Sequence, residues 1–214
     1  MVDRTISRRE PRRLKARVAL INAGLALLAQ GATAPPSVDE VVERAGVAKS
    51  SFFNHFVDRE GFFTALAEAI RERVEAQVAL LNLDIVDPAG RMARAVCGLA
   101  RFALAGPRAA RVLTRSDAVA IGRSHPLNTG ARADIALGLE TGRFRATDPM
   151  AAFILLTGVA RGLLTTIAAD EHEEPAVHRL TAEVLALLLI GLGLDPDEAR
   201  LVSMQAADSV IAQA

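Results

Sequence analysis

Apolar residues recur along most of the chain at the spacing of helices, and prolines divide the pattern into segments. Val38, Val41, Val42 and Ala45 fall on one face of a short predicted helix, and a second short helix begins near Lys49. Farther on, an aspartate precedes proline at residues 87–88, 148–149 and 195–196, which suits a helix start because the carboxylate caps the first turn. Longer helices are predicted at residues 59–82, 88–105, 107–119, 127–141, 149–170, 175–193 and 196–212.

The composition indicates an all-α protein with a sizeable core. Half of the 214 residues are hydrophobic, while Tyr and Trp are absent, so strand signals are weak. The lone Cys97 excludes a disulfide within the chain and fits a reducing cytoplasm, where we expect it to be a packing residue rather than a redox sensor. Arg161 interrupts the apolar stretch 151–169, and the stretch 184–194 is too short to span a bilayer. We therefore predict a soluble, cytoplasmic protein without a membrane segment.

Residues 37–63 carry the most specific local pattern. Ser37 and Glu40 form a predicted capping box, and Gly46 lies where the chain must turn sharply. Val47, Phe52 and Phe56 would anchor the second helix in the core. This layout is typical of a helix-turn-helix, whose second helix enters the major groove of DNA.

The same segment, SVDEVVERAGVAKSSFFNHFVDREGFF, resembles the DNA-binding signature of the tetracycline-repressor (TetR) family. The resemblance implies a three-helix head on a larger helical body, and a transcriptional regulator rather than an enzyme. The sequence departs from the usual pattern at four places: Val42, Ala48, Phe53 and His55. The matching residues are Glu43, Ala45, Gly46, Val47, Lys49, Ser51, Phe56, Arg59 and Glu60.

We expect the outer face of the second helix and the basic N-terminus to contact DNA. Asn54 suits base reading because an amide can pair with adenine, and Arg59 would hold a phosphate. Taken singly, each of these residues is equally consistent with an ordinary solvated surface residue. The expected DNA-facing residues are Lys49, Ser50, Ser51, Phe53, Asn54, His55, Arg59, Arg12 and Arg13.

The distribution of charge supports this expectation. Residues 1–60 carry ten basic and seven acidic side chains, whereas the remainder carries fifteen and eighteen, so a neutral chain has a basic end. An arginine-rich arm before the first helix could follow a minor groove or the phosphates, or could be a merely soluble tail. We divide the chain into a DNA-binding domain, 1–58, and an effector-binding and dimerisation domain, 59–214.

The body is expected to form a dimer. Residues 139–166 also resemble the family, which implies that helices 149–170 and 175–193 pair with their symmetry mates. Helix 149–170 is apolar on more than one face, so a monomer would leave apolar surface exposed. Gly158 and Gly162 would allow a close approach of helices.

A small-molecule pocket would lie among the helices 88–105, 107–119, 127–141 and 149–170. The same positions also fit an ordinary core. The candidate wall residues are Met92, Val96, Leu99, Phe102, Phe153, Thr157 and Arg161, with Arg101 as a second possible partner of an anion.

The patterns of catalysis and cofactor binding are missing from the sequence. Glycine-rich phosphate loops, paired cysteines and a nucleophile elbow do not occur, and His172, Glu174 and His178 fit a solvated loop better than a zinc site. We expect no cofactor and no metal. The favoured function is a homodimeric repressor, released from a palindromic DNA operator by a small-molecule effector. A non-sensing or activating regulator, and an all-α enzyme or ligand carrier with a degenerate head, are the alternatives.

Overall fold

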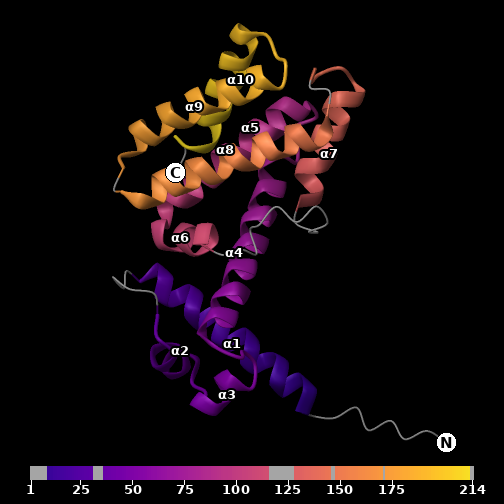
Figure 1. Cartoon of the computed structure of the whole chain (residues 1–214). Coiled ribbons are helices and arrows are strands. Elements are labelled where there is room, and N and C mark those ends of the chain that lie inside the picture. The colour runs from indigo at the N-terminus through magenta and orange to yellow at the C-terminus, as the bar shows by residue number, and fades with distance from the viewer. Residues whose placement is uncertain (1–8, 31–35, 116–127, 146–147, 171, 213–214) are drawn as a thin grey trace, which may run out of the picture.

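The computed structural model describes residues 9–30, 36–115, 128–145, 148–170 and 172–212, and these residues form ten α-helices. Helices α1–α3 make a small head below the rest of the chain, and α4 rises from the head into the body (Figure 1). The expected all-α class is confirmed. The helices are α1 (Arg9–Ala29), α2 (Val38–Ala45), α3 (Lys49–Phe53), α4 (Arg59–Leu81), α5 (Pro88–Ala105), α6 (Pro107–Arg115), α7 (Thr129–Glu140), α8 (Pro149–Ala169), α9 (Glu174–Gly191) and α10 (Pro196–Val210).

Aromatic rings form the centre of the head. Phe52, Phe56 and Phe62 are buried and lie with ring centroids 5.1–5.3 Å apart, so α3 and the start of α4 share one core. Gly24 of α1 lets the helices approach closely, because a Cβ there would lie 2.8 Å from the Phe62 ring. The expected anchors Phe52 and Phe56 are confirmed, and Val47 is partly buried.

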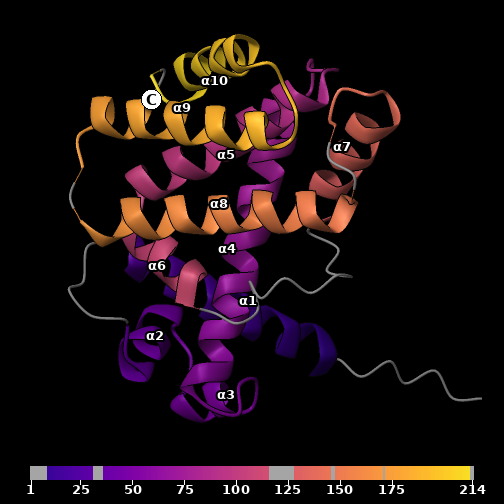
Figure 2. The same cartoon turned by 45° about the horizontal axis from the view of Figure 1, so that its top comes forward.

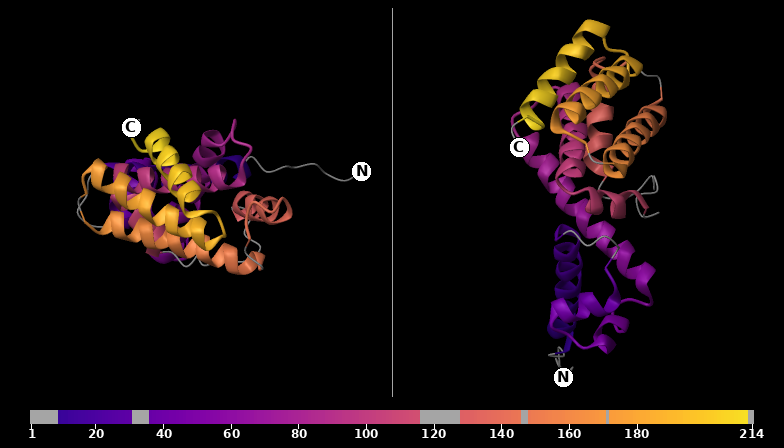
Figure 3. Two further views of the ribbon diagram at one scale, coloured as in Figure 1. Left: turned by 90° about the horizontal axis from the view of Figure 1, so that it is seen from above. Right: turned by 90° about the vertical axis from the view of Figure 1, so that its left-hand side faces the viewer.

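Helix α4 is the mechanical link between head and body. Asp58 caps it by accepting from the Gly61 N–H at 2.7 Å, and Phe62 and Leu66 bury its first half against α1. Its second half packs on α5. The side view shows α4 crossing from the head into the body as one helix (Figure 3). A change in the direction of α4 within the body would therefore move the head.

The body is arranged around α5, which contacts every other body helix from α4 to α10. Asp87, Asp148 and Asp195 each accept from two backbone N–H groups of the following helix, as the aspartate–proline pattern predicts. Helices α8 and α9 run in opposite directions along one face of the body (Figure 2). Over the described residues, the predicted body helices agree with the observed ones to within two residues, apart from the end of α6 beyond Arg115, which lies outside them.

Part of the basic N-terminal stretch is helical. Helix α1 begins at Arg9, so Arg13 and Arg17 project from a helix rather than from an extended arm. Arginine and lysine are good helix formers, and the fixed helix limits how far these side chains can reach. Residues 1–8 lie outside the described part of the chain.

Candidate nucleic-acid interface

The turn between α2 and α3 has the predicted geometry. The Ser37 hydroxyl accepts from the Glu40 N–H at 3.2 Å, and Glu40 accepts from the Ser37 N–H at 2.8 Å, which completes the capping box. Gly46 has a φ of 64°, in the left-handed region where glycine avoids a Cβ penalty. Ala48 caps α3 without a side-chain hydrogen bond, as the missing hydroxyl implies. These local interactions set the turn between α2 and α3.

Helix α3 presents the expected residues to solvent. Lys49, Ser50, Phe53 and Asn54 are exposed, and Ser51 and His55 are half-buried. The helix ends at Phe53, so Asn54 is its C-cap and His55 lies in the following turn rather than on the helix. The structure thus brings all six side chains to one short segment at the tip of the head.

Two of the expected cations already have partners within the protein. Lys49 forms an ion pair with Asp39 of α2, with 2.7 Å between Nζ and Oδ1. Arg59 lies over the Phe63 ring at 5.4 Å and donates to the Pro36 carbonyl at 3.4 Å. Both side chains remain near the surface, so a phosphate could replace these contacts.

Helix α1 adds positive charge beside the turn after α3. Burial lowers the pKa of His55, and the charges of Arg13 and Arg17 lower it further, so the ring is neutral near pH 7. Arg17 also lies over the Phe56 ring at 5.7 Å. Arg12 belongs to α1, but its side chain is outside the described part. Arg17 was missing from the expected site because its proximity to His55 depends on how α1 packs.

The expected effector residues separate into two groups. Met92, Val96 and Phe153 are buried in the core, whereas Leu99, Phe102 and Thr157 are partly buried and Arg161 is exposed. Thr157 donates to the Phe153 carbonyl of its own helix at 2.8 Å, and Arg161 donates to the Thr114 carbonyl of α6 at 2.8 Å. Of these residues, Phe102 lines a groove between α4 and α5.

The histidines near residue 175 and the lone Cys97 have other surroundings in the described residues than a metal or redox site. Those residues contain no group of three or more His, Cys, Asp or Glu side chains arranged for a metal. His178 instead contacts Asp208 at 2.8 Å, and His172 contacts the Thr166 carbonyl at 3.2 Å. Cys97 is fully buried, and burial raises the pKa of its thiol to about 12, so it packs as an apolar side chain.

The fold and this site define an all-α helix-turn-helix protein, a DNA-binding transcriptional regulator. The sequence profile of the bacterial regulatory proteins of the tetR family matches residues 20–66, and that of the tetracyclin repressor-like C-terminal domain matches residues 87–205. The chain belongs to the TetR family, whose regulators are not enzymes. Among curated proteins, none matches the sequence.

Several solved structures share the fold over nearly the whole chain. The sequence is 25% identical to that of RolR, whose structure in complex with resorcinol matches with a TM-score of 0.70 and covers 91% of this chain and 95% of RolR. A TetR-family regulator from Pectobacterium atrosepticum is 21% identical, with a TM-score of 0.70 over 89% and 99%. FadR from Bacillus subtilis in complex with stearoyl-CoA is 16% identical, with a TM-score of 0.61 over 81% and 98%.

Helix α8 is long and apolar enough, by length and composition, to cross a membrane, alone among the described helices. Only 33% of its most apolar stretch is buried within the single chain. Most of the apolar surface of α8 is therefore exposed in the single chain.

Proposed function

We propose that the protein is a homodimeric repressor whose two heads bind the half-sites of a palindromic operator. The observation that carries this proposal is the tip of the head, where the exposed face of α3 lies beside the cations of α1. Asn54 would contact bases and Lys49 would contact phosphates. The other proposed DNA-facing residues around them are Ser50, Ser51, Phe53, His55, Arg59, Arg12 and Arg13. The proposed division is a DNA-binding domain, 1–58, and an effector and dimerisation domain, 59–214, acting in the cytoplasm.

The exposed face of α8 and α9 supports dimerisation. Ile154 is 52% exposed and Leu187 is 69% exposed, and Leu155 and Leu180 are each 38% exposed. The two helices lie side by side on one face of the body (Figure 2), and the Leu155 side chain lies 3.2 Å from where a Cβ of Gly191 would be. An apolar surface spanning two helices is what a twofold four-helix interface buries.

Release by a small molecule is supported by relatives of the same fold. RolR was crystallised with resorcinol and FadR with stearoyl-CoA, so two proteins of this fold form complexes with organic ligands. In this chain, a ligand in the body would act on the heads through α4. Among the expected wall residues, Phe102 belongs to a groove beside that helix.

Selection of genomic fragments by the purified protein at near-physiological salt tests the proposal. Enrichment of a short palindrome is the expected result, because a twofold dimer reads two equivalent half-sites. Tight binding of fragments without a shared sequence would contradict an operator-specific repressor and indicate a non-specific architectural role.

Lys49 and Asn54 should contribute differently to operator binding. Lys49→Ala is expected to weaken binding to all sequences and to lower the dependence of affinity on salt, because one phosphate contact is lost. Asn54→Ala should relax preference at one operator position, at a cost of about 1–3 kcal/mol. Fluorescence anisotropy over a salt series measures both effects. Arg200→Ala on α10 is the matched control for charge, and a salt slope equal to that of the control would remove the phosphate role of Lys49.

His55 should make operator binding sensitive to pH. The pKa of His55 in the folded protein lies below its usual value. The neutral ring therefore stabilises the fold at pH values above the usual pKa. This stabilisation is lost as the pH falls through the lowered pKa. A phosphate at His55 would favour the charged ring instead, so binding would take up a proton. Operator affinity is expected to rise as the pH falls through the usual pKa of histidine, about 6.5, by at most about tenfold per pH unit. The His55→Gln protein should lack this rise, and an identical rise in both proteins would exclude a phosphate at His55.

A further inference from the structure

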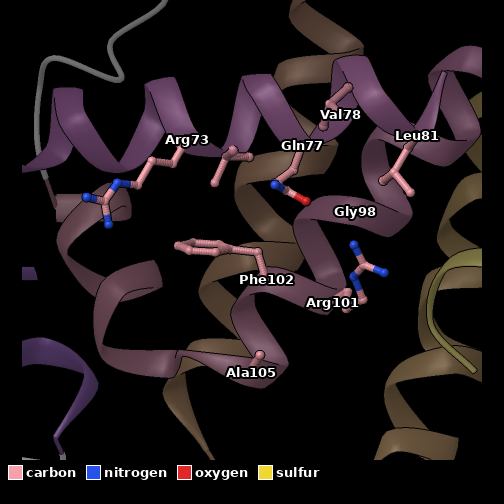
Figure 4. Close-up of a pocket in the computed structure, with 9 residues that line it drawn as sticks. Arg73, Gln77, Val78, Leu81, Gly98, Arg101, Phe102 and Ala105 are labelled. Carbon is pink, nitrogen blue, oxygen red and sulfur yellow. The ribbon is translucent and has the colours of Figure 1, made fainter. Parts of the chain in front are cut away.

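A groove of about 390 Å³ lies between the second half of α4 and the second half of α5. Its walls are mainly apolar and include Val74, Val78 and Leu81 of α4 and Phe102 of α5. The Phe102 ring extends from α5 towards α4, with Arg73 towards one end of the groove and Arg101 towards the other (Figure 4). At about 30 Å³ for each non-hydrogen atom, the groove holds roughly a dozen such atoms.

The charges around the groove select an anion. None of the ion pairs formed by the described residues involves Arg73 or Arg101. Arg101 donates to the Val210 carbonyl at 3.3 Å, which fixes its positive charge at the end of α10. An apolar groove with two guanidinium groups, and with Gln77 as its further polar side chain, suits an organic molecule with an apolar body and a carboxylate.

Arg73 connects this groove to the DNA-binding head. Its Nη2 donates to the Asn22 Oδ1 of α1 at 3.2 Å, across a gap of fifty-one positions in sequence. This hydrogen bond joins the body half of α4 to the first helix of the head. Its acceptor is a neutral amide, and a carboxylate is a stronger acceptor for a guanidinium. A carboxylate in the groove would therefore compete with Asn22 for Arg73.

We propose that the α4–α5 groove binds a small organic carboxylate with an apolar body of about ten carbons, and that its carboxylate displaces Asn22 from Arg73. The apolar body lies against Phe102, Val78 and Leu81, and the displaced Asn22 loosens the contact between α1 and α4. The binding site stands on the groove itself, whereas its effect on operator affinity rests on the proposed function.

Calorimetric titration of the full-length protein with decanoate, in the absence of DNA, tests the site. Decanoate is expected to bind one site per chain, and decanol, which lacks the charge, should bind at least about tenfold more weakly. Arg73→Gln and Phe102→Ala should each weaken decanoate by about tenfold, while the control Arg200→Gln leaves it unchanged. Asn22→Ala should strengthen decanoate binding, because the competing acceptor is gone. No binding of decanoate, or equal affinity in Arg73→Gln and Arg200→Gln, would overturn the proposed site.

Operator binding in the presence of decanoate tests the regulatory step separately. Saturating decanoate is expected to lower operator affinity about tenfold in the unmodified protein and to have little effect in Arg73→Gln. Decanoate that binds in the groove without changing operator affinity would overturn the coupling through Asn22. A protein that binds decanoate but no DNA would instead count against the proposed repressor and leave the groove assignment in place.

Discussion

Gly138→Ala is expected to lower the free energy of unfolding by about 2 kcal/mol, because the position has no room for a methyl group. A Cβ at Gly138 of α7 would lie 2.1 Å from Cδ2 of Phe144, whose ring is 2% exposed. The Phe144 N–H also donates to the Gly138 carbonyl at 2.8 Å, which holds the ring over the helix. Since the ring cannot move out without opening the core, the clash exceeds the gain in helix propensity, which is at most about 1 kcal/mol.

Urea unfolding followed by circular dichroism, at one fixed protein concentration, measures the effect of Gly138→Ala. Gly130 on the same helix is the matched control, because a Cβ there would meet nothing within 4 Å, so Gly130→Ala should be neutral or slightly stabilising. Phe144→Leu should relieve the clash, so the double mutant should be less destabilised than the sum of the two single mutants. Equal stabilities of Gly138→Ala and Gly130→Ala would contradict the packing of Phe144 on α7.

This contact illustrates what the sequence does not reveal. In the sequence, Gly138 is an ordinary glycine within a helical pattern. A glycine is needed there because the chain turns at Gly142, which has a φ of 70°, and brings Phe144 back over α7. The helix starts were predictable for the opposite reason. Asp87 and Asp148 cap the helices that begin at the next residue. Each aspartate accepts hydrogen bonds from residues no more than three positions later in the sequence. A single sequence therefore predicts local interactions such as helix caps, but it does not predict how distant segments pack against each other.

The candidate DNA-binding site was predictable to the same extent. The exposure of Lys49 and Asn54 follows from the spacing of the buried Phe52 and Phe56, which turns the remaining positions outward. The partners of these side chains, such as Asp39 for Lys49, required the angle between α2 and α3. The groove between α4 and α5 was predicted only on its α5 side, where Phe102 and Arg101 were expected to line a pocket. Its α4 wall, with Arg73, was missed because a sequence alone does not show which residues of two helices face each other.

Gly158→Glu is expected to convert the proposed dimer into a monomer and to weaken operator binding by about 10²-fold or more. Gly158 lies on the exposed face of α8, and a Cβ there would meet nothing within 4 Å in the single chain. The substitution therefore leaves the protomer unstrained and improves its helix propensity. In a four-helix interface, however, the same position would face the partner, where a carboxylate would be buried without a partner charge. Loss of the dimer removes the advantage of binding two half-sites together.

Sedimentation velocity and operator anisotropy, on the same preparations, separate an interface effect from misfolding. Gly130→Glu is the control, because it makes the same chemical change at another open helical glycine, on α7. We expect Gly130→Glu to remain dimeric with unchanged affinity, while Gly158→Glu sediments as a monomer with unchanged helix content. A Gly158→Glu protein that remains dimeric and binds the operator normally would move the interface away from α8. The exposed Ile154 and Leu187 would then need a different partner, because an apolar face of this kind is not left in water by a soluble regulator.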